Sequence, residues 1–183
     1  MKPRAKNSLP GMTFIALGSN LGDSIVILQR AMRRLECLSD SPLTESSFWQ
    51  SSPVDCPPGS PVFVNAVVGL KPRADETPES LLAKLQELEG EFGRQPKMVL
   101  NEPRLLDLDL IAFGAESRDA AQLTLPHPRA HLRRFVLEPL CEIVPDLILP
   151  GQSKPVAELL RDLRSDERVQ RLDLPGGDAK LRL

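Results

Sequence analysis

The sequence of 183 residues predicts an α+β fold, in which helices pack on one mostly antiparallel β-sheet. Segments with the apolar pattern of strands and segments with the apolar spacing of helices follow one another in the order strand, helix, strand, strand, helix, strand. This order lacks the regular strand–helix repeat of a doubly wound parallel sheet. It is the order of a ferredoxin-like α/β sandwich, here followed by a short extended piece and further helices.

The first strand and the first helix are joined by a tight loop. Thr13 to Leu17 is an apolar run of strand length, and the turn-forming residues 18–23 follow it. Asp23 stands where a helix N-cap is expected, because apolar residues recur at helical spacing from Ser24 to Leu38.

Two further strands flank a proline-rich loop. Thr44 to Trp49 has the pattern of a strand, and the four prolines within residues 51–61 exclude regular structure there. Val62 to Leu70 is rich in valine and is predicted to be a strand buried on both faces. The polar Asn65 within this apolar strand needs a hydrogen-bonding partner.

A second helix and the last main strand enclose a long loop. Thr77 and Pro78 open a helix with proline at its first position, and Gly93 closes it. Residues 94–104 have no clear period, which predicts a surface loop. Leu105 to Phe113 alternates as a strand does, with Asp107 and Asp109 on one face and Leu106, Leu108 and Leu110 on the other.

The C-terminal third predicts an extended piece over Leu123–Pro128 and helices over Arg129–Ile143 and Val156–Leu163. We therefore expect a frayed leader at residues 1–11, a single domain at 12–164, and a charged, frayed C-terminal tail at 165–183.

Composition limits the partners that we expect. The formal net charge of −2 gives the whole chain no electrostatic attraction to nucleic acid or to an anionic membrane. No stretch approaches the roughly 18 apolar residues that a membrane helix needs. The three cysteines are odd in number and lack C-x-x-C spacing, which favours a reduced compartment. We expect a cytoplasmic monomer without nucleic-acid or membrane partners.

Two carboxylates in the last main strand carry the strongest chemical signal. Asp107 and Asp109 are two residues apart, so their side chains project from the same face, with about 7 Å between their Cα atoms. Mg²⁺ is bound through one or two carboxylates together with substrate phosphates, so the pair predicts a metal site. The alternative is an exposed strand face on which both aspartates are merely solvated.

Basic and polar residues near this strand suit a nucleotide. Arg104 lies three residues before Asp107, and Arg94 lies at the other end of the same loop. Guanidinium groups bind phosphate, and carboxylates bind its metal ion. Gln86 and Glu89 share a helix face and can bond a base or ribose, and His127 can face phosphate. Taken singly, each of these residues can equally be an ordinary surface or loop residue.

Several ordered motifs together resemble the 6-hydroxymethyl-7,8-dihydropterin pyrophosphokinase family over about residues 14–150. The motifs are Ile15–Asp23 (IALGSNLGD), Phe63–Ala66 (FVNA), Pro103–Asp109 (PRLLDLD), Leu125–Pro128 (LPHP) and Arg133–Leu137 (RRFVL). The resemblance implies an enzyme of folate biosynthesis that transfers the β,γ-diphosphate of ATP to the hydroxymethyl group of the pterin and releases AMP. It also implies a ferredoxin-like fold and two Mg²⁺ ions bound with ATP.

The resemblance assigns roles to individual residues. It places the pterin between Phe63 and Phe135, with Asn65 and the backbone of the Ser51 to Val54 loop at its hydrogen-bonding edge, and Trp49 beside the pocket. It places ATP against Gln86, Glu89, Arg94, Arg104, Thr124, His127 and Arg133. The implied catalytic residues are Arg94, Arg104, Asp107 and Asp109, of which the two aspartates hold the metal ions. Asp109 is also a candidate to accept the hydroxyl proton.

Two other classes of function remain open at this level. The implied lid loop at 95–102 carries one basic residue, Lys97, where family members often carry more. A non-catalytic protein that binds pterin or nucleotide, with a degenerate lid, is therefore the alternative. An α+β interaction domain with an acidic strand is a third possibility, and it would not bind ATP.

Overall fold

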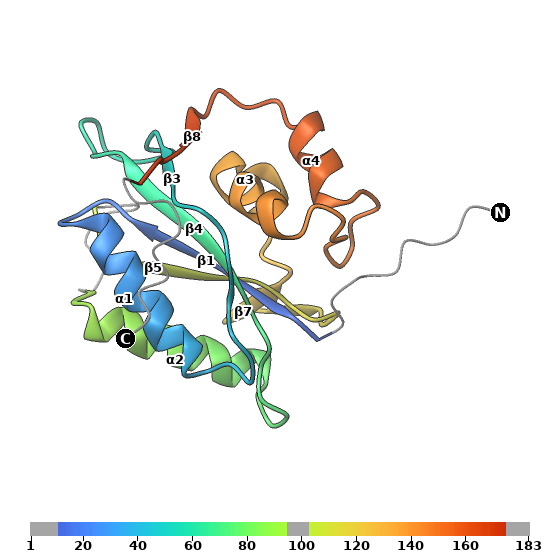
Figure 1. The fold of residues 1–183 in the computed structure, drawn as a ribbon. Coiled ribbons are helices and arrows are strands. Elements are labelled where there is room, and N and C mark those ends of the chain that lie inside the picture. The colour runs from blue at the N-terminus through green and yellow to red at the C-terminus, as the bar shows by residue number, and fades with distance from the viewer. Residues whose placement is uncertain (1–10, 95–102, 175–183) are drawn as a thin grey trace.

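One antiparallel sheet organises the computed structural model, which describes residues 11–94 and 103–174 (Figure 1). Its strands run in the order β5-β1-β4-β3-β8, with β2 also paired to β4, and β6 and β7 form a separate ladder. The strands are β1 (Thr13–Ser19), β2 (Thr44–Glu45), β3 (Trp49–Ser51), β4 (Phe63–Leu70), β5 (Asp107–Phe113), β6 (Arg118–Ala120), β7 (Leu123–Leu125) and β8 (Val169–Arg171). The predicted α+β class with an antiparallel sheet is confirmed.

Helices cover both faces of this sheet (Figure 1). Helices α1 (Ser24–Glu36) and α2 (Pro78–Glu91) pack on one face, against apolar side chains such as Ile15 and Leu17 of β1. Helices α3 (Arg134–Ile143) and α4 (Val156–Asp162) pack on the other face, and the 3₁₀ helix η1 (Ala130–Leu132) precedes α3. Within the described residues, no helix is long and apolar enough to cross a membrane.

Both predicted helix starts are confirmed by their caps. Asp23 Oδ1 accepts a hydrogen bond from the backbone nitrogen of Val26 at 3.2 Å. Thr77 Oγ1 accepts from the nitrogen of Ser80 at 3.1 Å, and Ser80 Oγ accepts from the nitrogen of Thr77 at 2.9 Å. These bonds satisfy donors that the first turn of a helix leaves unpaired. The predicted end of α2 also holds, because Gly93 has φ +87°, which favours glycine.

The structure corrects two predicted elements. The single strand expected over Thr44–Trp49 is two short strands, because the hydroxyl of Ser46 accepts the hydrogen bond from the nitrogen of Val67 at 2.9 Å. A side chain thus replaces the backbone carbonyl in the ladder and interrupts it. The helix expected over Arg129–Ile143 is divided at Arg133, where the backbone is extended.

The C-terminal expectation is also corrected. The prediction that the chain is frayed after Arg164 is wrong for β8, because this strand pairs with β3 and places Val169 opposite Ser51. Backbone pairing needs no apolar side chains, so the charged composition of this segment concealed a strand. The short strand β6 was missed for the same reason. Predictions made for residues 1–10, 95–102 and 175–183 lie outside the described residues.

Candidate active site

The site lies on the part of the sheet that α3 leaves uncovered. Phe14, Val67 and Ile111 belong to the apolar core beneath α3 and α4. Further along the same face, Gly18 of β1 pairs with Asp107 on one side and with Asn65 on the other. Side chains on one face of a sheet alternate with those on the other, so these residues form a floor beside α3.

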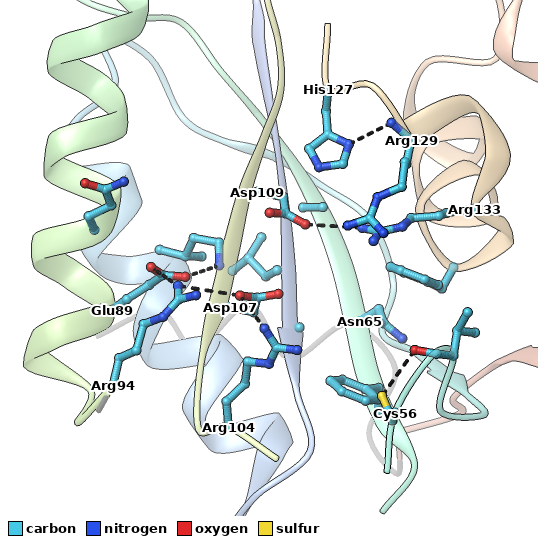
Figure 2. A pocket seen from close by; sticks show the side chains of 18 of the residues that line it. Cys56, Asn65, Glu89, Arg94, Arg104, Asp107, Asp109, His127, Arg129 and Arg133 are labelled. Atoms are coloured by element: carbon cyan, nitrogen blue, oxygen red, sulfur yellow. Dashed lines mark hydrogen bonds and ion pairs between the residues drawn. The ribbon is translucent and has the colours of Figure 1, made fainter. Parts of the chain in front are cut away.

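A cavity of about 270 Å³ opens above this floor (Figure 2). Its walls come from β1, β4, β5, helix α2, the loop after β3, and the segment from His127 to Phe135. The residues that line it are Ala16, Leu17, Gly18, Val54, Cys56, Phe63, Asn65, Leu82, Gln86, Glu89, Arg94, Arg104, Asp107, Leu108, Asp109, His127, Arg129, Arg133 and Phe135.

Arginines surround the acidic pair (Figure 2). Asp107 Oδ1 lies 3.1 Å from Arg104 Nη1 and 3.6 Å from Arg94 Nη1. Asp109 Oδ2 lies 3.6 Å from Nη1 of Arg133. Within the described residues, the buried Nε of Arg104 has no hydrogen-bond partner. A buried donor without a partner is costly, so this guanidinium is suited to an anionic ligand.

The electrostatics of Asp109 and His127 differ from those of exposed groups. Burial raises the pKa of Asp109, and the neighbouring Asp107 carboxylate raises it further, against the opposing effects of His127 and Arg133. Burial also lowers the pKa of His127, despite the nearby Asp109. A divalent cation would favour the ionised form of both aspartates, so this donor set fits a metal ion that prefers oxygen ligands.

His127 is held in one orientation. Its Nδ1 accepts a hydrogen bond from the nitrogen of Arg129 at 3.2 Å, and its own backbone nitrogen donates to the carbonyl of Ile111 at 2.9 Å. An imidazole that accepts at Nδ1 carries its hydrogen at Nε2, so His127 has a donor available for an acceptor such as phosphate oxygen.

Glu89 is almost completely buried, with 2% of its surface exposed. Its Oε1 accepts from the nitrogen of Leu108 at 2.8 Å, and its Oε2 forms an ion pair with Arg94. Burial raises its pKa, and the Leu108 and Arg94 contacts oppose that shift. Glu89 lines the cavity as predicted, but both of its oxygens are engaged in joining α2 to β5 and orienting Arg94.

Asn65 also has a fixed orientation. Its Nδ2 donates to Ser51 Oγ at 2.9 Å and to the carbonyl of Trp49 at 3.3 Å. The oxygen of the amide is directed along the cavity floor toward Gly18. Oδ1 lies 3.5 Å from the position that a Cβ on Gly18 would take. Asn65 therefore presents an acceptor to a ligand that offers N–H donors.

The structure brings together most of the residues predicted for the site and leaves out three. Ser51 is buried behind Asn65 and does not line the cavity. Thr124 is an exposed residue of β7, paired with Asp119 outside the cavity. Trp49, expected beside the pocket, instead directs its indole nitrogen to Glu142. For Ser51 and Trp49, the direction of the side chain depends on contacts with residues that are distant in sequence, Asn65 and Glu142.

Cys56 and Arg129 line the cavity but were not predicted as site residues. Arg129 follows His127 by two residues and its backbone holds that imidazole, so the spacing from the histidine was the signal that could have found it. No sequence pattern pointed to Cys56, which the loop after β3 carries into the cavity.

Comparison with known proteins assigns the chain to a family. Residues 14–145 match the family described as 7,8-dihydro-6-hydroxymethylpterin-pyrophosphokinase (HPPK). The chain belongs to the HPPK family. The match includes the acidic strand β5, the Asn65 strand β4, and α3 with Phe135.

Relatives in the HPPK family are similar over most of the chain. A 2-amino-4-hydroxy-6-hydroxymethyldihydropteridine pyrophosphokinase of Haemophilus influenzae is 39% identical over 158 residues, which cover 86% of this chain and 96% of the relative. The enzyme of the same name from Synechocystis is 36% identical over 149 residues, which cover 81% of this chain and 74% of the relative.

The fold is shared with HPPK structures. A crystal structure of an HPPK-DHPS in complex with substrates matches 84% of this chain with a TM-score of 0.67 and 12% sequence identity. At that identity the likeness shows the fold alone. The present chain spans 43% of that longer chain.

Proposed function

We propose that this protein transfers the β,γ-diphosphate of ATP to the hydroxymethyl group of 6-hydroxymethyl-7,8-dihydropterin, in folate biosynthesis. The observation that carries the proposal is that Asp107, with its arginines, and Asn65 flank the same glycine, Gly18, at the floor of one cavity. A site for a metal-bound phosphate and a site for a hydrogen-bonding heterocycle are therefore adjacent. Membership of the HPPK family supports the same reaction.

The reaction exchanges one phosphorus–oxygen bond for another. The hydroxymethyl oxygen of the pterin forms a bond to the β-phosphorus of ATP, and the bond from that phosphorus to the oxygen bridging the α- and β-phosphates breaks. The electron pair of the broken bond leaves with AMP, and the hydroxyl proton is released. The protein contributes mainly position and electrostatic stabilisation to a transfer of this kind.

The nucleotide half of the cavity is formed by α2, β5 and the segment after β7. Arg94, Arg104 and Arg133 would contact phosphate oxygens, and His127 would donate a hydrogen bond from Nε2. Gln86 on the cavity wall would contact the ribose or the base. Glu89 contributes by orienting Arg94 through their ion pair.

Asp107 and Asp109 would hold two Mg²⁺ ions in this half of the site. The ions would neutralise charge on the triphosphate of ATP and so favour transfer of its β,γ-diphosphate. The fit is supported by two carboxylates on one strand face, both paired with arginines, and by the raised pKa of Asp109, to which burial and the Asp107 carboxylate contribute.

The pterin half is formed by Phe63, Asn65 and Phe135, together with Val54 of the loop after β3. Aromatic rings bind a flat heterocycle by stacking, and Asn65 Oδ1 would accept from its N–H groups. Ser51 would support this half indirectly, because it holds the Asn65 amide rather than lining the cavity.

The decisive experiment measures AMP release from ATP and Mg²⁺ by the purified protein, with and without 6-hydroxymethyl-7,8-dihydropterin. We expect AMP only when the pterin is present. Binding of both ligands without AMP would identify the non-catalytic alternative, which the names of the relatives do not favour. Absence of ATP binding would refute the proposal altogether.

A further inference from the structure

A short stretch of the C-terminal segment contacts both walls of the pterin half. Glu167 and Arg168 lie just before β8, beyond the residues that match the family. Glu167 reaches the start of α3, which carries Phe135, and Arg168 reaches Ser52, at the start of the loop that carries Val54. Two adjacent residues thus connect two cavity walls that are about 80 residues apart in sequence.

The contact with α3 involves a backbone group of the helix N-terminus. Arg133, the N-cap residue, makes no side-chain capping hydrogen bond. The nitrogen of Phe135, in the first turn, donates to Glu167 Oε2 at 3.2 Å. Ser165 Oγ accepts from the nitrogen of Glu167 at 3.2 Å and so fixes the turn that presents the carboxylate. A negative charge at this end of a helix is favourable.

The contact with the loop is a pair of hydrogen bonds. The nitrogen of Ser52 donates to the carbonyl of Arg168 at 3.0 Å, and the nitrogen of Arg168 donates to Ser52 Oγ at 3.3 Å. The pairing then continues into β8, with Val169 opposite Ser51. The first residues of the pterin loop are therefore fixed to the same segment that holds Phe135.

We propose that Glu167 is a positioning residue for the pterin, because it joins the backbone of Phe135 to the segment that anchors the loop at Ser52. This inference rests on the proposed function. Without the carboxylate, the first turn of α3 loses its hydrogen bond to the segment that anchors the loop. The contact of Trp49 with Glu142 remains, two turns further along the helix, so the two walls are held less firmly at the end that carries Phe135. Binding then includes the cost of ordering them.

Loss of the Glu167 carboxylate affects the nucleotide half of the cavity differently from the pterin half. The Glu167 carboxylate acts as an opposite charge on Arg133, a residue of that half. Removing a negative charge beside Arg133 does not reduce its attraction for phosphate. The substitution is therefore expected to weaken pterin binding selectively, which is not expected of general destabilisation.

The test compares Glu167→Ala and Glu167→Gln with Asp166→Ala, which removes an exposed carboxylate from the adjacent position. Calorimetry measures the Kd of the Mg²⁺ complex of an ATP analogue with a methylene group between the α- and β-phosphates. It then measures the Kd of 6-hydroxymethyl-7,8-dihydropterin in the presence of that analogue.

We expect the Kd of the pterin to rise about tenfold in Glu167→Ala, as for the loss of a charged contact at a helix N-terminus. It should rise about threefold in Glu167→Gln, which keeps an acceptor oxygen, and stay unchanged in Asp166→Ala. The Kd of the analogue should stay within about twofold in all three.

An unchanged Kd of the pterin in Glu167→Ala, or a parallel rise for both ligands, would overturn the inference. If Glu167→Ala does not fold, the Glu167→Gln protein decides, and wild-type affinity in that variant refutes the positioning role. Failure of the proposed function is distinguishable, because the wild-type protein would then release no AMP from ATP, whether or not it binds the pterin.

Discussion

The indole nitrogen of Trp49 donates a hydrogen bond to Glu142 Oε2 at 3.0 Å, so strand β3 is attached to helix α3. The same carboxylate accepts from the nitrogen of Ser47 at 2.9 Å and from Ser47 Oγ at 2.6 Å. Trp49 is the single tryptophan in the chain. Its fluorescence therefore reports directly on this connection, one strand away from Asn65.

The fluorescence of Trp49 should change only at acidic pH. Burial by itself would raise the pKa of Glu142, but the hydrogen bonds from Ser47 and Trp49 outweigh it, so the pKa is lowered. Ionised Glu142 thus stabilises the folded protein, and this stabilisation is complete above the pH range in which glutamate titrates in the unfolded chain. It is lost as the pH falls through the lower pKa that Glu142 has in the folded protein. An emission titration measures this transition.

Glu142→Gln is the control for that titration, because it keeps an acceptor and removes the ionisation. The acidic transition of the emission should disappear in this variant. A transition that persists unchanged, or one at or above the ordinary pKa of glutamate, would contradict the assignment to Glu142.

Loss of either aspartate of β5 should abolish most turnover. Asp107→Ala and Asp109→Ala each remove a carboxylate proposed to hold Mg²⁺, and kcat should fall about a hundredfold or more if the ion contributes several kcal/mol. AMP release at saturating substrates measures kcat. Asp119→Ala, on the exposed strand β6, is the matched control and should behave as wild type. Near-normal turnover in both β5 variants would refute their assignment.

Glu89→Ala should lower both stability and nucleotide binding. It leaves the nitrogen of Leu108 without its acceptor and Arg94 without its ion pair, so the free energy of unfolding should fall by about 2 kcal/mol. Urea denaturation measures the loss. Glu87→Ala removes an exposed carboxylate from the same helix and should change stability by less than about 0.5 kcal/mol. Equal effects of the two substitutions would show that the buried contacts of Glu89 contribute nothing.

Substitution of Thr124 should leave nucleotide binding intact, whereas substitution of Arg133 should not. Thr124 lies outside the cavity, so Thr124→Ala should change the KM for ATP by less than about twofold. Arg133 lines the cavity, and Arg133→Ala should raise that KM about tenfold through loss of a charge-assisted contact. Steady-state kinetics separate the two. A large effect at Thr124 would mean that β7 contacts the nucleotide after all.

The sequence by itself determined the features that depend on neighbouring residues. Alternation along β5 placed Asp107 and Asp109 on one face, because successive side chains of a strand point in opposite directions. The helix starts at Asp23 and Thr77 followed from local capping chemistry. The order of strands and helices was sufficient for the fold class, and the ordered motifs were sufficient for the family.

Only the tertiary structure decided which side chains face a ligand and which face the protein. It directed Ser51 to Asn65 and Trp49 to Glu142. It also engaged both oxygens of Glu89 with Leu108 and Arg94, and it paired the charged β8 with β3. Such contacts join residues that are far apart in the chain, and their formation depends on which surfaces the packed helices cover. Periodicity fixes the direction of a side chain relative to its own backbone, but its partner is fixed by the packing of the whole domain.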